Sequence, residues 1–298
     1  MGGRQAGWPR STSGWRLAPL RATMDVVAGT LYLVGTPIGN LKDMTDRARE
    51  TLMGVDVIAA EDTRRTGRLL ASCGVGKKKT LSLFEGNERA RTRELVRVLQ
   101  DGKDVALVSD AGMPGLSDPG FLLVRECIAE GIDIRVVPGP SAVVAALVVS
   151  GLPTDRYAFE GFLPKRAGER RTRLRAMAWD PRTVVLFESP LRVATLLRDV
   201  LVELGDRQVV IARELTKLHE EVVRGRTSEV LARLGDHELK GEVVVVLEGA
   251  RERHLVDLEA LAVEARALVE AGMRKRDAAA EIARTHGTSA NELYRKLI

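Results

Sequence analysis

A loop rich in glycine, proline and aspartate follows a short apolar run in the middle of the chain. The run is Val105–Val108, and the eleven residues from Asp110 to Gly120 hold three glycines, two prolines and two aspartates. Such a loop leaves backbone amides open at the end of a buried strand, where ligands of open α/β sheets bind. A plain strand-to-helix connection, with Asp118 capping a helix that starts near Pro119, explains the segment equally well.

Three other predicted strands also end in loops of unusual composition. These loops are Gly35–Asn40, Glu61–Arg65 and Pro138–Ser141. The carboxyl ends of parallel strands share one edge of a sheet, so we expect the four loops to converge on one site.

Acids and bases stand side by side directly after one of these strands. Glu61 or Asp62 is a candidate to accept a proton from a substrate hydroxyl, and Arg64 is a candidate to orient a phosphate. The ordinary alternative is a capped helix start with acids in the first turn.

Two of the loops limit the kind of ligand. Gly35–Gly39 lacks the glycine spacing of a dinucleotide fold and the Gly-Lys-Ser/Thr of a P-loop, which disfavours a phosphate-bearing cofactor. Pro138–Ala142 places rigid backbone and the Ser141 hydroxyl at the start of an apolar helix, where they could bind a carboxylate or carbonyl. Ser141 as a simple N-cap is an equal alternative.

A basic run over Leu163–Arg175 carries six cations against one acid. It begins with Pro-Lys-Arg, which indicates a loop. We expect Lys165, Arg166, Arg170 and Arg171 to bind RNA phosphates, although a solvated helix face is the usual explanation of a charge run.

Composition places the chain among globular proteins. It has 298 residues, of which 45% are hydrophobic, enough for two domains. The longest apolar run, Ala142–Val149, is too short to span a bilayer. Cys73 and Cys127 lie far apart without metal-ligand spacing, so we expect a cytoplasmic protein without zinc or another metal site.

The formal charge of +5 is concentrated near the N-terminus. Residues 1–24 hold four arginines and no acid, which leaves the remainder nearly neutral, and attraction for polyanions must come from local patches. This segment has neither periodicity nor the apolar centre of a secretory signal. It reads as a disordered tail or as sequence upstream of a functional start at Met24, and its composition would also suit an organelle transit peptide.

The pattern beyond this segment predicts two α/β units and a helical end. Strands and helices alternate from Thr30, which implies a parallel sheet, and a second unit with a mixed sheet follows. We expect Asn87 to cap a helix that runs to Gln100, and Ser289 to cap the last helix of the chain. Three helices over Leu255–Glu270, Lys275–Thr285 and Ser289–Leu297 suit a helix-turn-helix, whose contact with RNA stays open. The expected domains are 1–28, 29–140, 141–250 and 254–298.

Six motifs occur along the chain: Leu33–Thr45, Ala60–Arg64, Val108–Gly120, Val137–Ala142, Phe187–Pro190 and Arg213–Lys217. In order and spacing they resemble those of the small-subunit ribosomal RNA cytidine 2′-O-ribose methyltransferases of the tetrapyrrole-methylase (class III) fold family. The resemblance covers about Leu31 to Leu247, and the terminal helices resemble the helical appendage of that family.

The resemblance implies S-adenosylmethionine as methyl donor, bound in a cleft between two α/β domains. By analogy the donor-binding residues are Pro37, Ser109, Asp110, Ala111, Met113, Ser117, Ser141, Ala142, Leu163, Arg213, Glu214, Gly241, Glu242 and Val243.

The resemblance also implies a substrate and a state of assembly. The substrate is a cytidine in the decoding region of small-subunit ribosomal RNA, and family members often form homodimers. Two alternatives stay open at this point: a tetrapyrrole C-methyltransferase, and a non-catalytic RNA-binding assembly factor with the same fold.

Overall fold

The computed structural model describes residues 28–235, 239–250, 258–286 and 288–298. The chain divides into two compact units. The first runs to Pro37 and resumes over Leu41–Pro140, and the second takes Ile38–Asn40 and Ser141–Ile298. The expected N-terminal tail up to residue 27, and residues 255–257 of the first terminal helix, lie outside the described residues.

The first unit contains a five-stranded parallel sheet. The strands are β1 (Leu31–Val34), β2 (Val57–Ala60), β3 (Lys79–Ser82), β4 (Val105–Val108) and β5 (Ile134–Val137). Their spatial order is β3-β2-β4-β1-β5. All residues of β2 and β4 are buried, because a strand covered on both faces must be apolar throughout.

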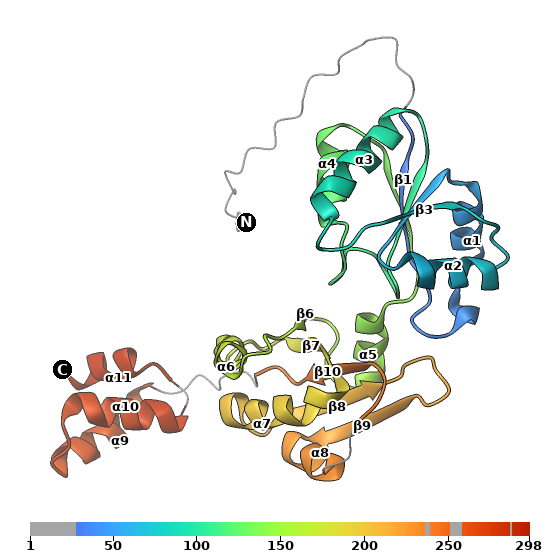
Figure 1. The fold of residues 1–298 in the computed structure, drawn as a ribbon. Helices are drawn as coiled ribbons and strands as arrows, with labels where there is room; N and C mark the ends of the chain where they lie inside the picture. Colours follow the sequence, from blue (N-terminus) through green and yellow to red (C-terminus); the bar gives the residue numbers. More distant parts are fainter. Residues whose placement is uncertain (1–27, 236–238, 251–257, 287) are drawn as a thin grey trace, which may run out of the picture. The chain divides into compact units, whose positions relative to one another are not determined.

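Helices cover both faces of this sheet (Figure 1). One face carries α1 (Asp46–Gly54), which follows the 3-10 turn η1 (Leu41–Asp43), and α2 (Thr63–Ser72); the other carries α3 (Glu88–Gln100) and α4 (Phe121–Ala129). The chain leaves β1 toward β2 and leaves β4 toward β5, in opposite directions across the sheet. The topological switch point, where open α/β sheets bind ligands, therefore lies between β1 and β4.

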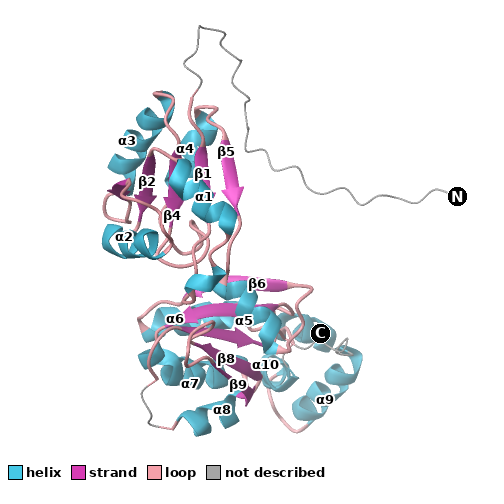
Figure 2. Cartoon of the chain, turned by 90° about the vertical axis from the view of Figure 1, so that its right-hand side faces the viewer, coloured by secondary structure: helices cyan, strands magenta, loops and turns pink. Residues whose placement is uncertain are grey.

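The second unit contains a mixed five-stranded sheet, as expected (Figure 2). Its strands are β6 (Tyr157–Phe162), β7 (Thr183–Glu188), β8 (Gln208–Arg213), β9 (Glu221–Arg226) and β10 (Val243–Leu247). The spatial order is β6-β7-β10-β8-β9, in which β6 and β7 are parallel and every other pair is antiparallel.

Alternation along β10 divides the core of this unit into two layers. Val243, Val245 and Leu247 pack in one layer with helices α6 (Ala167–Ala176), α7 (Val193–Leu204) and α8 (Thr227–Leu234). Val244 and Val246 pack in the other layer with α5 (Ala142–Ser150). Successive side chains of a strand point to opposite faces, so a run of five apolar residues can serve both layers.

Three terminal helices pack on one another around a small core of their own. They are α9 (Leu258–Glu270), α10 (Lys275–His286) and α11 (Ala290–Leu297). Alanines such as Ala265 and Ala279 are buried in this core. The Ser289 hydroxyl accepts a hydrogen bond from the amide of Glu292 at 3.3 Å, which confirms Ser289 as the cap of the last helix.

Neither residue considered as a cap in the first unit makes a side-chain cap bond. Asn87 occupies the N-cap position of α3, as expected, but its side chain does not cap the helix; its Oδ1 accepts from the amide of Phe84 at 2.9 Å and closes the preceding turn. Asp118 does not cap α4, whose N-cap is Gly120. The Glu88 carboxylate of α3 accepts from the Gly120 amide at 2.8 Å instead. The cap comes from another helix, so local sequence could not reveal it.

The basic run differs from the expected exposed loop, because most of it forms α6. Arg170 is only 5% exposed, and its Nε donates to Asp199 at 2.7 Å. Arg171 donates to the other oxygen of Asp199 at 2.7 Å. Burial opposes ionisation of Asp199, but the bonds from Arg171 and Arg170 prevail and lower its pKa. Arg170 therefore ties α6 to α7.

Replacing Asp199 by Ala should destabilise the protein by about 3–5 kcal/mol, because it leaves the buried Arg170 guanidinium unpaired. Urea denaturation measures the change. Asp46→Ala is the control, since it removes an exposed ion pair with Arg49 and should cost up to about 1 kcal/mol. A loss below about 1 kcal/mol in D199A would contradict the assignment of this pair as a structural tie.

Candidate active site

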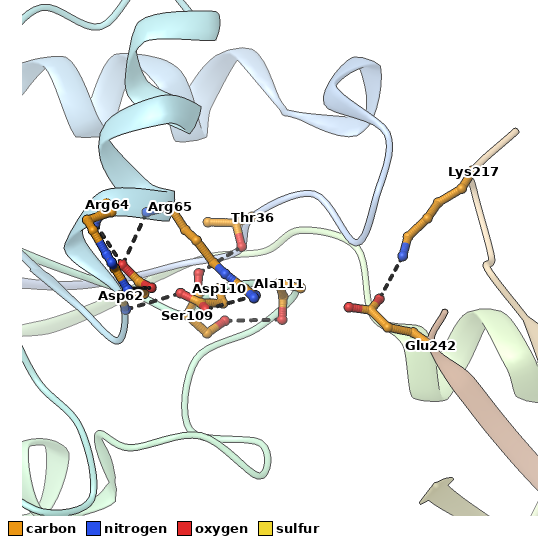
Figure 3. Close-up of polar contacts among 9 residues, drawn as sticks. All are labelled: Thr36, Asp62, Arg64, Arg65, Ser109, Asp110, Ala111, Lys217 and Glu242. Atoms are coloured by element: carbon orange, nitrogen blue, oxygen red, sulfur yellow. Dashed lines mark hydrogen bonds and ion pairs between the residues drawn. The ribbon is translucent and has the colours of Figure 1, made fainter. Parts of the chain in front are cut away.

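Backbone hydrogen bonds join the loops that follow β1 and β4. The Thr36 amide donates to the Gly112 carbonyl at 2.9 Å, and the Gly112 amide donates back at 3.1 Å. The buried Thr36 hydroxyl donates to the Ser109 carbonyl at 3.2 Å. Figure 3 shows the bond between Thr36 and Ser109. Together these bonds close the sheet edge at the switch point and hold the glycine-rich loop in place.

Two glycines let the loops after β1 and β5 touch. A Cβ on Gly35 would lie 2.6 Å from the backbone nitrogen of Gly139, closer than packing allows. The Gly35 amide donates to the Val137 carbonyl at 2.9 Å. Gly35 and Gly139 are therefore needed for close approach of backbone to backbone, and not for a phosphate cradle.

The loop after β2, Glu61–Arg65, joins the same edge by contacts with Asp110 of the loop after β4. Asp110 Oδ1 accepts from the Asp62 amide at 3.1 Å, and Asp110 Oδ2 lies 3.2 Å from Arg65 Nη1. Figure 3 shows these contacts between the start of α2 and the loop after β4. All four loops thus meet at one edge of the sheet.

Asp62 acts as the N-cap of α2. Its carboxylate accepts from the amides of Arg64 at 2.8 Å and Arg65 at 3.3 Å. The bond from the Arg64 amide is the largest cause of its lowered pKa. The capped helix start is therefore confirmed, although the first turn of α2 carries no acid. These capping bonds leave Asp62 a poor proton acceptor.

The pKa values of Glu61 and Asp118 are raised, in contrast to the lowered pKa of Asp62. Burial, and next the charge of Asp110, raise the pKa of Glu61. Burial, followed by the charge of Glu61, raises the pKa of Asp118 to about 6, although a hydrogen bond with Ser109 opposes the shift. Sequence reasoning missed Asp118, which it interpreted as a cap. The only available signal was its place in the same loop as Asp110.

These carboxyl groups give the edge two chemical properties. Their negative charge suits a cationic ligand such as a sulfonium, and the exposed backbone around Ala111 offers hydrogen bonds. A carboxyl group with a raised pKa near reacting atoms can accept a proton close to neutral pH.

The remaining residues expected near the donor in these loops occupy varied positions. Met113 packs over Gly35, where its sulfur would lie 2.8 Å from an added Cβ. Ser117 is exposed and adopts a left-handed φ of 66°, a conformation that costs free energy outside glycine. Ser141 caps α5 and accepts from the Val144 amide at 3.5 Å; Ala142 follows it, and Pro37 follows Thr36.

The second unit brings another group of expected residues to one edge of its sheet. Val243 pairs with Glu188 on one side and Arg213 on the other. Arg213 is held by Glu221, with Nη2 and the carboxylate 3.0 Å apart, and donates to the Lys240 carbonyl at 3.2 Å. These contacts fix the guanidinium at the strand end.

Glu214 organises the turn that follows β8. It adopts a left-handed φ of 51°, and its Oε1 accepts from the Glu242 amide at 2.9 Å and from Lys217 at 2.7 Å. Lys217 also donates to Glu242 at 3.0 Å (Figure 3). A Cβ on Gly241 would strike the Glu214 carboxylate at 2.3 Å, so this position requires glycine. Lys217 was missed, although the motif Arg213–Lys217 contains it.

Leu163, also expected near the donor, does not lie with these residues at the sheet edge. It is 3% exposed and belongs to the core around α6 and α7, so its side chain has no free surface for a ligand. Lys165 and Arg166 are exposed, and Arg166 lies 3.3 Å from Glu169. The Arg64 side chain is 88% exposed and 3.4 Å from Asp62.

A buried ion pair at the end of β7 was also missed. Glu188, 3% exposed, accepts from the Ser189 amide at 2.6 Å and pairs with Arg192. Arg192 Nη1 is buried and bonds no residue in the part of the chain that the structure describes. The motif Phe187–Pro190 was the only signal, and it stops short of Arg192.

Comparison with known proteins decides the family. The tetrapyrrole (corrin/porphyrin) methylase family matches residues 30–231. The chain belongs to this family of methyltransferases. It is 52% identical over 221 residues to the ribosomal RNA small subunit methyltransferase I of Thermotoga maritima, covering 74% of this chain and 99% of the relative. The enzyme of the same name from Escherichia coli O157:H7 is 44% identical, with 90% and 94% covered.

Solved structures agree on the fold. Uroporphyrin-III C-methyltransferase from Thermus thermophilus, in complex with S-adenosyl homocysteine, has a TM-score of 0.53 at 22% identity and covers 74% of this chain and 97% of its own. A diphthine synthase has a TM-score of 0.56 at 18% identity, with 74% and 90% covered. The predicted methyltransferase family and two-sheet α/β fold are thereby confirmed.

Neither a metal cluster nor a membrane span is found in the described ranges. No group of three or more His, Cys, Asp or Glu side chains there could hold a metal ion. No helix among the described residues is long and apolar enough to cross a membrane.

Asp118→Asn should stabilise the protein at neutral pH. The folded pKa of Asp118, about 6, is above the unfolded value of about 3.9, so its stabilising contribution is complete below about pH 4 and is lost as the pH rises through about 6. Relative to wild type, D118N should therefore gain stability from pH 4.5 to pH 7.5, by an amount on the order of 1 kcal/mol after solvent screening. Thermal unfolding at both pH values measures the difference in stability between D118N and wild type. The same difference at both pH values would contradict the prediction.

Proposed function

We propose that this protein transfers a methyl group from S-adenosylmethionine to the ribose 2′-hydroxyl of a cytidine in the decoding region of small-subunit ribosomal RNA. The observation that carries the proposal is identity of 41–52% to proteins named ribosomal RNA small subunit methyltransferase I, over 74–91% of the chain. The solved structures, all below 25% identity, support the fold alone.

The loops at the edge of the first sheet fit the methyl donor. S-adenosylmethionine supplies a methyl group activated by a positively charged sulfur. Asp110 and Asp118 supply negative charge in the loop that carries the exposed residue Ala111. The rigid loop geometry set by Thr36 and Gly112 is what an in-line transfer requires, because most of its acceleration comes from alignment.

Glu61 is our candidate to receive the hydroxyl proton. Its raised pKa makes it a better base than Asp62, whose lowered pKa and capping bonds hold it to α2. Burial is the main cause of the raised pKa of Glu61, and the charge of Asp110 adds to it, although a hydrogen bond from the Asp110 backbone opposes the shift. Arg65 holds Asp110 in place, 3.2 Å from its carboxylate.

Exposed cations are our candidates to bind the RNA. Lys165, Arg166 and Arg171 lie at or near the start of α6, and Arg64 lies at the start of α2. Arg170 serves the fold instead, because it is buried against Asp199. We further propose that the protein acts in the cytoplasm on the small ribosomal subunit, and that it forms a homodimer.

Glu61→Gln should lower the rate of methyl transfer by about 10²–10⁴-fold, since Gln cannot accept the proton. Donor affinity, measured by calorimetry, should stay within about twofold. Asp62→Asn keeps an N-cap of equal quality and should lose no more than about threefold in rate. An unchanged rate in E61Q, measured under single-turnover conditions, would remove Glu61 from the chemistry.

Mapping ribose methylation tests the proposed function. Small subunits from cells lacking this gene are incubated with the protein and labelled donor, and the modified nucleotide is located by mass spectrometry. Label on one decoding-region cytidine supports the proposal. Label on uroporphyrinogen offered in parallel would favour a tetrapyrrole methylase, and label on neither, despite binding to the subunit, would favour a non-catalytic assembly factor.

A further inference from the structure

A groove on the outer face of the first unit carries a row of arginines. It lies between α3 and α4, has a volume of about 570 Å³, and is lined along α3 by Arg89, Arg93 and Arg97. These residues recur every four positions, so they share one helix face and follow one another at about 6 Å. All three are exposed.

Among the described residues, the guanidinium groups of this row have no partner. No hydrogen bond or ion pair joins the side chain of Arg89, Arg93 or Arg97 to another residue in that part of the chain. The two acids across the groove have other contacts: Glu130 accepts from the neutral Gln100 at 3.0 Å, and Glu126 lies 3.7 Å from Arg125. The lining holds Arg89, Arg93, Arg97 and Arg125 against Glu126 and Glu130, so its net charge is positive.

A buried hydroxyl in the groove also lacks a partner. Thr92 lines the groove and is 2% exposed, and its Oγ1 makes no hydrogen bond to any described residue. A helical threonine ordinarily bonds the carbonyl four residues earlier, and leaving a buried hydroxyl unsatisfied costs about 1–3 kcal/mol. This is an observation independent of the arginines, and it points to a hydrogen-bonding ligand.

We propose that the α3–α4 groove binds the phosphate backbone of the RNA substrate. Guanidinium groups match phosphate oxygens with two parallel hydrogen bonds, and three of them along one helix can contact successive phosphates. Arg125 stacks 5.9 Å from the ring of Phe121, which is 66% exposed. An exposed aromatic ring beside a cation is a stacking platform for an unpaired base.

The direction of α3 connects this groove with the candidate active site. Glu88, at the start of α3, bonds the Gly120 amide at the carboxyl edge of the sheet. The helix then runs away from that edge for thirteen residues, about 20 Å. In Figure 1, α3 and α4 lie side by side on this face. RNA that presents one nucleotide at the edge can thus extend along the arginine row.

A second copy of this chain fits the groove less well. In a two-fold symmetric contact the same patch meets itself, which would set unpaired arginines against unpaired arginines. A polyanion is the complementary occupant. The inference rests on the proposed function, since it names how the same RNA substrate is held.

The charge-reversal variant R93E/R97E tests the groove. The matched control is R47E/R233E, which reverses two exposed arginines on α1 and α8. Affinity for small ribosomal subunits is measured by filter binding at several salt concentrations, together with donor affinity by calorimetry and thermal unfolding. R93E/R97E should bind subunits at least about tenfold more weakly, with a salt dependence reduced by about one to two counterions, while donor affinity and melting temperature match the control.

Affinity and salt dependence equal to those of the control would overturn the inference, as would a change confined to the oligomeric state in sedimentation. Failure of the proposed function looks different: the wild-type protein itself would then leave the decoding-region cytidine unmethylated. If the wild type methylates and R93E/R97E is indistinguishable from the control, the groove alone is refuted.

Thr92→Val removes the hydroxyl but keeps the packing of the side chain, because valine and threonine have nearly the same shape. If Oγ1 bonds a phosphate, T92V should weaken subunit binding by about three- to tenfold while its melting temperature stays equal or rises. Unchanged binding would remove the hydroxyl from the site.

Discussion

The two-way backbone bridge between Thr36 and Gly112 is the contact on which the candidate active site depends. It lies where the chain leaves β1 and β4 in opposite directions, which is where the sheet opens to a ligand. Gly35 meets Gly139 beside it because neither carries a Cβ. The unusual composition of these loops is thus explained first by packing, and the open backbone that results serves the methyl donor.

Local sequence patterns predicted most of the strands and helices. They could not predict the contacts between them. Apolar runs such as Val105–Val108 identified buried strands, since their pattern is set by burial alone. Arg170 and Asp118 were misread because their roles depend on Asp199 and Glu61, far away in sequence. Helix α6 was not predicted because its polar residues show almost no periodicity. Family motifs supplied the donor and the reaction, which spacing alone could not.

The roles of the charged residues depend on whether their side chains bond other residues of the protein. Arg170 and Arg213 are fixed by carboxylates, and both hold local structure. The side chains of Arg93 and Arg97 bond no described residue, so their charge is available to a polyanion. Among carboxylates, Asp62 is committed to a helix cap, whereas burial and neighbouring charge raise the pKa of Glu61 and Asp118.

The central claim is that the loops after β1, β4 and β5 form the donor site. Hydrogen exchange with and without S-adenosyl homocysteine tests it most directly, because it reports on each loop separately. The account predicts slower exchange of the amides around Ala111 and Gly139, with no change in α9–α11. Unchanged exchange in these loops at saturating ligand, or protection confined to other segments, would contradict it.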